Sequence, residues 1–356
     1  MSSNPDEMTG TMKAIGFHEH GDIDQIELLD VPIPSIGDND VLVNVKASSL
    51  NHQDLFAVRE LDHYITEYPF WGGGDIAGVV EVVGDDVSDW SAGDRVVVNS
   101  RISCRECDLC LNGEQSMCRN LKVIGEHRRG GFAEYVDVPE RNLHPLPDHV
   151  SFETAAAVPI AAGCAWRALM NRGDIRPPHD LLVVGATGGV GTYAIQIAKN
   201  VIGVETLYAI TGSESKTERL QEMGVDHVIN YNEEEFDRKI WELTDKTGVD
   251  AVFNTVGGDT WVKSMRCLRN GGKFITSGAT AGPNPETEIR LIFMRQLEVF
   301  GSTSHSHSDF VDMLDHVWNG RIEPVIQETI RLSDYEVAFE KMANRGLYGK
   351  LILTQS

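Results

Sequence analysis

The chain has 356 residues and contains 54 Asp or Glu against 31 Lys or Arg, which gives a formal net charge of −23. This length predicts about two domains, and 41% hydrophobic residues exclude a disordered or fibrous protein. The acidity argues against nucleic-acid and membrane partners, because phosphate backbones and anionic head groups repel it. Since the acidic residues are spread along the chain, they favour a halophilic surface screened by concentrated salt over an ordinary acidic enzyme.

The sequence pattern of the first third of the chain predicts mostly strands, and that of the rest predicts strands and helices in alternation. Gly, Asp and Pro turns separate β-branched runs at 41–46, 76–83 and 95–99. From about residue 180, short apolar strands alternate with helical stretches; the strands are 180–185, 206–210, 228–231, 251–254, 273–277 and 297–302, and the helices are 190–200, 216–223 and 234–244. Alternation over about 130 residues predicts a parallel doubly wound sheet, so the fold class is α/β. A final helix from about residue 310 and a strand at 350–354 are expected to return to the first domain.

Targeting features predict a cytoplasmic protein. No segment approaches the ~18 apolar residues that a membrane helix needs. The acidic N-terminal stretch MSSNPDEMTG has neither the basic nor the apolar region of a signal peptide. Six cysteines in a reducing compartment then point to metal binding rather than to disulfides.

Four of those cysteines are clustered. Cys104, Cys107, Cys110 and Cys118 lie within fifteen residues. Four thiolates suit tetrahedral zinc, and a fully thiolate site leaves no open position for a substrate, so we expect one structural zinc. An iron–sulfur cluster, disulfides or a redox switch are the alternatives.

A glycine-rich turn follows the strand at 180–185. The segment 181–191 reads LLVVGATGGVG, and in register with G-x-G-x-x-G its positions are Ala186, Gly188 and Gly191. Between a strand and a helix, the backbone N–H groups and the helix N-terminus can hold a pyrophosphate. A purely structural turn is the alternative.

The end of the next strand indicates which dinucleotide binds. An acidic residue at that point would hold the ribose of NAD, but Thr211 stands twenty residues after Gly191. Ser213 and Lys216 could donate to a 2′-phosphate that a carboxylate would repel. NADP is therefore favoured over NAD, although Glu214 is near.

Taken together, these features resemble the zinc-containing medium-chain dehydrogenase/reductase superfamily, which includes alcohol dehydrogenases and quinone oxidoreductases. The resemblance covers nearly the whole chain and rests, beside the glycine turn and the four cysteines, on the segments NHQD (51–54), GGDIAG (73–78), GDRV (93–96), GGFAEY (130–135) and GK (349–350). It implies a GroES-like catalytic domain at 1–168 with a zinc lobe at about 100–120, a Rossmann NADP-binding domain at 169–305, and a C-terminal return at 306–356. The cofactor would lie in the cleft between the domains.

Departures from the family pattern indicate the mechanism. The alcohol dehydrogenases of this family hold a catalytic zinc through three side chains, whose matching positions here are Asn51, Gly74 and Ile160. Glycine and isoleucine cannot coordinate zinc and asparagine is a poor ligand, so polarisation of an alkoxide by a metal is implausible.

Asn-x-x-Asp without a catalytic zinc resembles the quinone oxidoreductase and enone reductase branches. The resemblance implies hydride transfer from NADPH to a quinone or an α,β-unsaturated carbonyl. Asn51 would lie beside the nicotinamide, and Asp54 would have a structural more than a catalytic role. Tyr64 is a candidate donor of a proton or hydrogen bond, with aromatic packing as the alternative.

The same residue-wise match implies the remaining cofactor contacts. His52 and Lys350 would contact the pyrophosphate, Cys164 would replace a threonine near the nicotinamide ribose, and Tyr231 would approach the adenosine. Asn254 would face the adenine and Gly278 the nicotinamide. The phosphates would be cradled by Gly188, Gly189 and Val190.

Two other functions stay open. One is an NADP-dependent alcohol dehydrogenase or carbonyl reductase that uses a side-chain proton donor, and the other is an NADPH-binding sensor without catalysis. In each case the partner is a small molecule or cofactor. Because the strand at 297–302 matches the family's dimer edge, a homodimer or homotetramer is expected.

Overall fold

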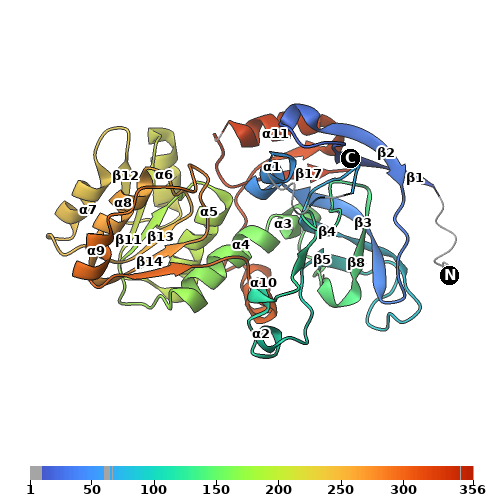
Figure 1. Ribbon diagram of the computed structural model, residues 1–356, viewed down its shortest axis with the longest axis horizontal. Helices are drawn as coiled ribbons and strands as arrows, with labels where there is room; N and C mark the ends of the chain where they lie inside the picture. Colours follow the sequence, from blue (N-terminus) through green and yellow to red (C-terminus); the bar gives the residue numbers. More distant parts are fainter. Residues whose placement is uncertain (1–9, 60–64, 66, 345, 356) are drawn as a thin grey trace. The chain divides into compact units, whose positions relative to one another are not determined.

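The computed structural model describes residues 10–59, 65, 67–344 and 346–355, and these form two units. Unit 1 contains the described residues up to Ile160 together with those from Ile326 onward, and unit 2 contains Ala161–Val325 (Figure 1). Residues 161–168 and 306–325, predicted to belong with the GroES-like part, lie in unit 2. The reason is a buried ion pair of 3.0 Å between the Arg167 Nη1 and the Asp309 Oδ2, which joins the two segments.

Unit 2 is built on a parallel six-stranded sheet, which confirms the predicted doubly wound fold. The strand order is β12-β11-β10-β13-β14-β15, and every neighbouring pair is parallel. Numbered from the first strand, this is the order 3-2-1-4-5-6 of dinucleotide-binding folds. The strands are β10 (Leu181–Val184), β11 (Leu207–Thr211), β12 (His227–Asn230), β13 (Val249–Asn254), β14 (Leu268–Thr276) and β15 (Glu298–Gly301).

Helices flank this sheet and bury its apolar side chains (Figure 1). They are α4 (Pro159–Trp166), α5 (Gly189–Gln196), α6 (Glu214–Glu222), α7 (Phe236–Leu243), α8 (Thr260–Arg266), α9 (Ile289–Met294) and α10 (His307–Trp318). π-Helical turns continue α4 through Arg172 and α5 through Ile202. The strand cores are continuous apolar runs, as expected for a parallel sheet covered by helices.

Unit 1 is mostly β-structure, as predicted. Its main sheet has the order β16-β17-β3-β4-β5-β9, and β8 also pairs with β3. The strands are β1 (Thr11–Gly16), β2 (Glu27–Pro32), β3 (Asp40–Ser49), β4 (Asp75–Val83), β5 (Arg95–Val98), β6 (Arg101–Ile102), β7 (Lys122–Val123), β8 (Tyr135–Pro139), β9 (Leu143–Pro145), β16 (Ile326–Arg331) and β17 (Lys350–Thr354). The helices are α1 (His52–Arg59), α2 (Asp108–Leu111), α3 (Phe152–Ala156) and α11 (Tyr335–Ala343).

The C-terminal strand returns to the first part of the chain, which confirms that expectation. β17 pairs antiparallel with β3, with Ile352 opposite Ser49. The pairing extends past β3, because the Leu50 N–H donates to the Leu351 carbonyl oxygen at 3.1 Å. Lys350 is thereby brought to the segment that leads into α1. In the described part of the chain, no helix is both long enough and apolar enough to span a bilayer.

Candidate active site and metal centre

A closed cluster of polar side chains forms where β3 ends and where α1, β4 and β17 begin. The Lys350 Nζ donates to the Asn51 Oδ1 at 2.6 Å and to the Asp75 Oδ2 at 3.1 Å. The Asn51 Nδ2 donates to the same Asp75 oxygen at 2.9 Å. Both ends of the Asn51 amide are therefore tied, and its orientation is fixed.

The charges in this cluster are almost completely removed from solvent. Asp75 is 0% exposed and Lys350 is 3% exposed. The Asp75 Oδ1 accepts from the Ile160 N–H at 2.7 Å, so both carboxylate oxygens have partners. A buried ion pair is tolerated only when its groups are paired and hydrogen-bonded in this way.

Lys350, the predicted pyrophosphate contact, is engaged by groups inside unit 1. Its third donor is used by the Leu50 carbonyl oxygen at 2.9 Å, so all three N–H donors have acceptors inside unit 1. The role of Lys350 in this structure is to fix Asn51 and to neutralise Asp75.

Asp54 also has a structural environment. Its two carboxylate oxygens accept from the Asn51 N–H at 2.8 Å and from the Gly73 N–H at 3.0 Å. It thus joins the start of α1 to the glycine segment before β4. Burial raises the pKa of the Asp54 carboxyl from 3.8 to about 7, although the two backbone donors oppose the shift.

The positions that match the zinc ligands of the alcohol dehydrogenases come together in the fold. A Cβ placed on Gly74 would lie 2.9 Å from the Ile160 Cδ1 and 2.9 Å from the Ile124 carbonyl oxygen. The position of the absent side chain is therefore filled by isoleucine and backbone. Among the described residues, the four-cysteine cluster is the only group of three or more His, Cys, Asp or Glu that could hold a metal ion.

That cluster has the geometry of a closed tetrahedral site. The Sγ atoms of Cys104, Cys107, Cys110 and Cys118 all lie within 4.8 Å of one another. Cys104 Sγ is 3.8 Å from Cys110 Sγ and 3.5 Å from Cys118 Sγ. Zn–S bonds of about 2.3 Å would give a tetrahedron with edges of about 3.8 Å, so the donor set fits zinc.

The local fold holds these thiols in place. Pairing of β6 with β7 closes the base of the lobe, and Cys107 caps the N-terminus of α2. Backbone N–H donors lower the pKa of Cys104, and they lower that of Cys107 to about 6. Burial raises the pKa of Cys110 to about 12, so metal binding must release its proton.

In unit 2, the glycine turn forms the predicted junction of strand and helix. Gly185 follows β10 with a φ of 91°, and Gly188 caps α5, whose first residues are Gly189 and Val190. A Cβ on Gly191 would collide with the Gly185 carbonyl oxygen, whereas a Cβ on Gly188 would lie 3.6 Å from it. Gly191 is thus required by packing, and Gly188 leaves room beside the helix N-terminus for a phosphate.

The residues predicted to select the nucleotide surround the end of β11. Thr211 is buried, and its hydroxyl accepts from the Ser213 N–H at 3.3 Å. Ser213 caps α6, whose first turn includes Lys216. A Cβ on Gly212 would collide with the Tyr231 hydroxyl, so the phenol of Tyr231 packs over this turn. The structure brings these four residues to one sheet edge.

Asn254, predicted to face the adenine, lies in a hydrogen-bond network at the end of β13. Its side chain is 0% exposed, and its Nδ2 donates to the Thr260 and Ser264 hydroxyls at 3.0 Å each. Its Oδ1 accepts from the Val256 and Gly257 N–H groups. All four hydrogen bonds of the amide are used, so Asn254 holds the loop after β13.

Three hydroxyls that sequence reasoning missed lie after β14 and β15. These neighbouring strands end at Thr276 and Gly301, and in the described part of the chain the buried hydroxyl oxygens of Ser277, Ser302 and Ser304 have no hydrogen-bond partner. Gly278, the predicted nicotinamide contact, is in the same segment. Ligands of doubly wound folds bind at this carboxyl edge, and unpaired polar atoms there fit a polar ligand.

The remaining predicted site residues are His52, Cys164 and Tyr64. His52 is the first residue of α1 and Cys164 lies in α4, and both are half-buried. Tyr64 lies outside the described residues.

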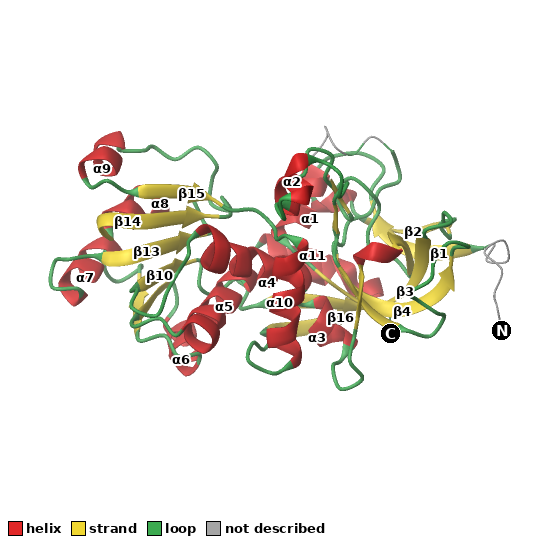
Figure 2. Ribbon diagram, turned by 90° about the horizontal axis from the view of Figure 1, so that it is seen from below, coloured by secondary structure: helices red, strands yellow, loops and turns green. Residues whose placement is uncertain are grey.

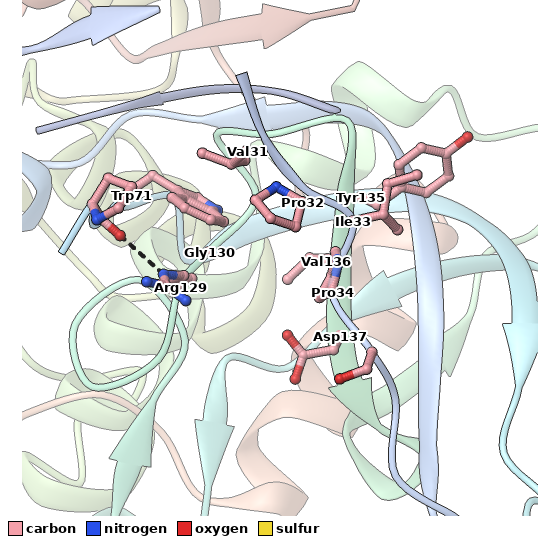
Figure 3. Close-up of a pocket in the computed structure, with 12 residues that line it drawn as sticks. Val31, Pro32, Ile33, Pro34, Trp71, Arg129, Gly130, Tyr135, Val136 and Asp137 are labelled. Carbon is pink, nitrogen blue, oxygen red and sulfur yellow. Dashed lines mark hydrogen bonds between the residues drawn. The ribbon is translucent and has the colours of Figure 1, made fainter. Parts of the chain in front are cut away.

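A separate pocket of about 310 Å³ lies in unit 1 (Figure 3). Trp71 and Arg129 border one side of it and Pro32 and Pro34 another. The Arg129 guanidinium lies 4.9 Å from the centre of the Trp71 ring, and its Nε donates to the Pro69 carbonyl oxygen at 3.0 Å. None of the predicted catalytic, cofactor or metal residues lines this pocket.

Comparisons with known proteins agree with this architecture. The family profile "Alcohol dehydrogenase GroES-like domain" matches residues 37–148, and "Zinc-binding dehydrogenase" matches residues 189–319. A crystal structure of an NAD-dependent alcohol dehydrogenase has a TM-score of 0.93 at 34% identity and covers 97% of this chain and 100% of its own. An acryloyl-coenzyme A reductase of Sulfurisphaera tokodaii is 28% identical, covering 92% of this chain and 96% of its own. An NAD-dependent alcohol dehydrogenase of the same organism is 29% identical with the same coverage.

Proposed function

The chain belongs to the medium-chain dehydrogenase/reductase superfamily of oxidoreductases, and on that premise we propose that it reduces an α,β-unsaturated carbonyl compound or a quinone without a catalytic metal. The proposal rests on one observation. The three positions that would hold a catalytic zinc are Asn51, Gly74 and Ile160, and two of them offer no ligand atom. The third, Asn51, is tied to Lys350 and Asp75.

A nicotinamide dinucleotide fits the groups of unit 2. The N–H groups from Gly188 to Val190 at the start of α5 would hold its pyrophosphate, and the hydroxyls of Ser277, Ser302 and Ser304 offer partners for a polar ring substituent. When bound, the cofactor supplies the hydride. NADPH is the favoured form, because no carboxylate occupies the end of β11 and Ser213 and Lys216 are near it.

The contribution of the chain is binding, orientation and exclusion of water. Lys350 and Asp75 hold the Asn51 amide in one orientation. In conjugate reduction, a hydride adds to the β-carbon and negative charge develops on the carbonyl oxygen. Donors placed around that oxygen stabilise the charge, and a proton from water then completes the reaction at the α-carbon.

The zinc lobe would supply no chemistry to the substrate. Four thiolate ligands close the coordination sphere, so its metal would stabilise the lobe alone.

A second function has one observation in its favour. The chain is as similar to alcohol dehydrogenases as to the acryloyl-coenzyme A reductase. An NADP-dependent carbonyl reductase without a catalytic zinc would share the fold and the cofactor site, and would differ in the carbon atom that receives the hydride.

A steady-state screen separates these functions. NADPH and NADH are each tested with quinones, with acryloyl-CoA and 2-cyclohexenone, and with simple aldehydes, with and without a mild chelator. We expect oxidation of NADPH by the unsaturated compounds or the quinones, unaffected by the chelator. Oxidation of simple alcohols that the chelator abolishes would contradict the proposal, and tight NADPH binding without any turnover would favour the sensor.

A further inference from the structure

We infer that the side-chain amide of Gln53 is the hydrogen-bond donor to the carbonyl oxygen of the substrate, in the place where zinc-dependent relatives use a metal. This inference rests on the proposed function and adds a catalytic residue to it. It is argued from the closeness of Gln53 to Gly74 and Ile160.

Gln53 differs from its polar neighbours in being unpaired. Asn51 is tied at both ends of its amide, and both Asp54 oxygens accept backbone N–H groups. Asp75 and Lys350 satisfy each other. The Gln53 Nε2, by contrast, is buried and has no hydrogen-bond partner among the described residues. Buried polar atoms in native proteins are nearly always paired, so an unpaired donor is a candidate for a bound ligand.

The Gln53 donor lies beside two of the positions that hold the catalytic metal in the alcohol dehydrogenase branch. The Gln53 Nε2 lies 3.6 Å from the position that a Cβ on Gly74 would occupy, and the Ile160 Cδ1 lies 2.9 Å from the same point. Both Gly74 and Ile160 stand at metal-ligand positions of the alcohol dehydrogenase branch. An amide N–H beside an apolar side chain gives a strong hydrogen bond to an anion, because little water competes there.

The amide would act on the developing enolate. Hydride from the dihydronicotinamide forms the new C–H bond at the β-carbon, and the π electrons of the C=C bond move to form a C=C bond between the α-carbon and the carbonyl carbon. The carbonyl π electrons move to oxygen, which accepts a hydrogen bond from Gln53. Loss of the hydride leaves the nicotinamide oxidised, and a proton from water then adds to the α-carbon, which gives the saturated carbonyl and a hydroxide ion that the solvent neutralises.

The stability of the protein without ligand provides a test that does not depend on turnover. Gln53→Met removes the donor at similar volume, and Gln53→Glu keeps the shape of the side chain but not the amide. Gln196→Met is the matched control, because the Gln196 amide is fully engaged: its Nε2 donates to the Glu323 carbonyl oxygen at 2.8 Å and its Oε1 accepts from the Glu323 N–H at 2.7 Å. Denaturant midpoints are measured for all three variants, and kcat and KM with NADPH and 2-cyclohexenone for those that fold.

Replacing an unsatisfied donor and replacing an engaged amide should move the denaturation midpoint in different ways. We expect Gln53→Met to keep or raise the denaturation midpoint while Gln196→Met lowers it. The kcat of both Gln53 variants should fall by about 100-fold or more, as for loss of an oxyanion donor, with the KM for NADPH within about twofold. A Gln53→Met variant that loses stability like Gln196→Met, or that keeps the wild-type kcat, overturns the role of Gln53. If the wild type reduces neither an unsaturated carbonyl nor a quinone, the proposed function fails as well.

Discussion

Asn51 owes its position to residues far away in the chain. Lys350 and Asp75 are 275 residues apart in sequence, yet they form a buried ion pair with Asn51 between them. Removing one partner of such a pair leaves an uncompensated charge and costs about 3–5 kcal/mol. The cluster therefore fixes the Asn51 amide much more firmly than a surface hydrogen bond would.

Asp54 should make stability depend on pH. Its pKa is about 7 in the folded protein against 3.8 for an ordinary Asp. Because folding raises this pKa, the contribution of Asp54 to the stability of the folded protein is fully present below about pH 4. It is lost as the pH rises through 7. Since one pKa unit corresponds to about 1.4 kcal/mol, the loss is a few kcal/mol.

The variant Asp54→Asn cannot titrate. We expect its free energy of unfolding to vary less between pH 5 and 8 than that of the wild type, as measured by urea denaturation at fixed ionic strength. Asp94→Asn, in an exposed turn where Asp94 accepts from the Ser91 N–H, is the control and should keep the wild-type slope. Parallel pH profiles for wild type and Asp54→Asn would exclude this role of Asp54.

At the scale of the elements, the glycine turn between β10 and α5 can be tested by a matched pair of substitutions, at Gly191 and at Gly188. Gly191→Ala places a methyl group against the Gly185 carbonyl oxygen, whereas the methyl group of Gly188→Ala makes only an ordinary contact of 3.6 Å with that oxygen. We expect Gly191→Ala to lower the thermal midpoint by several degrees. Gly188→Ala should keep that midpoint and weaken NADPH binding at least tenfold by titration calorimetry, because its methyl group occupies the phosphate position. Equal NADPH affinity in Gly188→Ala and wild type would show that the phosphates bind elsewhere.

The lobe between β6 and β7 should be held by its metal. Elemental analysis is expected to give about one zinc per chain, and removal of zinc by a strong chelator should lower the thermal midpoint. Cys110→Ser should have the same effect, while Cys164→Ser, outside the cluster, serves as the control. Two zinc ions per chain would contradict the argument from Gly74 and Ile160, and a chain without zinc would contradict the assignment of this site.

Sequence reasoning succeeded for elements whose signal is local. The apolar runs of β10 to β15, the glycine turn and the cysteine spacing each occupy a short segment, and the strands and the parallel order follow from them. The hydrogen-bond partners of Lys350 and Asn254 gave no local signal, because they depend on tertiary pairing of β17 with β3 and on the loop after β13. Gln53 gave no signal at all, since the lack of a partner is visible only when every neighbour is placed.

At the scale of the whole molecule, the charge of −23 opposes the binding of an anionic cofactor. Local donors at the start of α5 and around Ser213 and Lys216 must therefore offset the field of the protein. The halophilic character of this surface stays a prediction, since acidity alone does not report the salt in which the protein works.

An apolar surface at the edge of unit 2 predicts self-association. β15 is the edge strand of the sheet (Figure 2), and Ile289, Phe293 and Met294 on α9 are 69%, 64% and 70% exposed. Exposed apolar patches next to an unpaired strand edge are typical of interfaces. We expect a homodimer or homotetramer by light scattering and a smaller species for Phe293→Asp. Val337→Asp, at a 45% exposed residue of α11, should leave the mass unchanged. A wild type that is monomeric at micromolar concentration would contradict this expectation.

The carbon atom that receives the hydride tests the central claim most directly. With NADPH deuterated at the transferred C4 position and 2-cyclohexenone as acceptor, the product is identified by NMR in the presence of a mild chelator. Conjugate reduction without a catalytic metal predicts cyclohexanone with deuterium at C3. Formation of 2-cyclohexenol with deuterium at C1 would contradict the account, because it would mean that the enzyme reduces the carbonyl group itself.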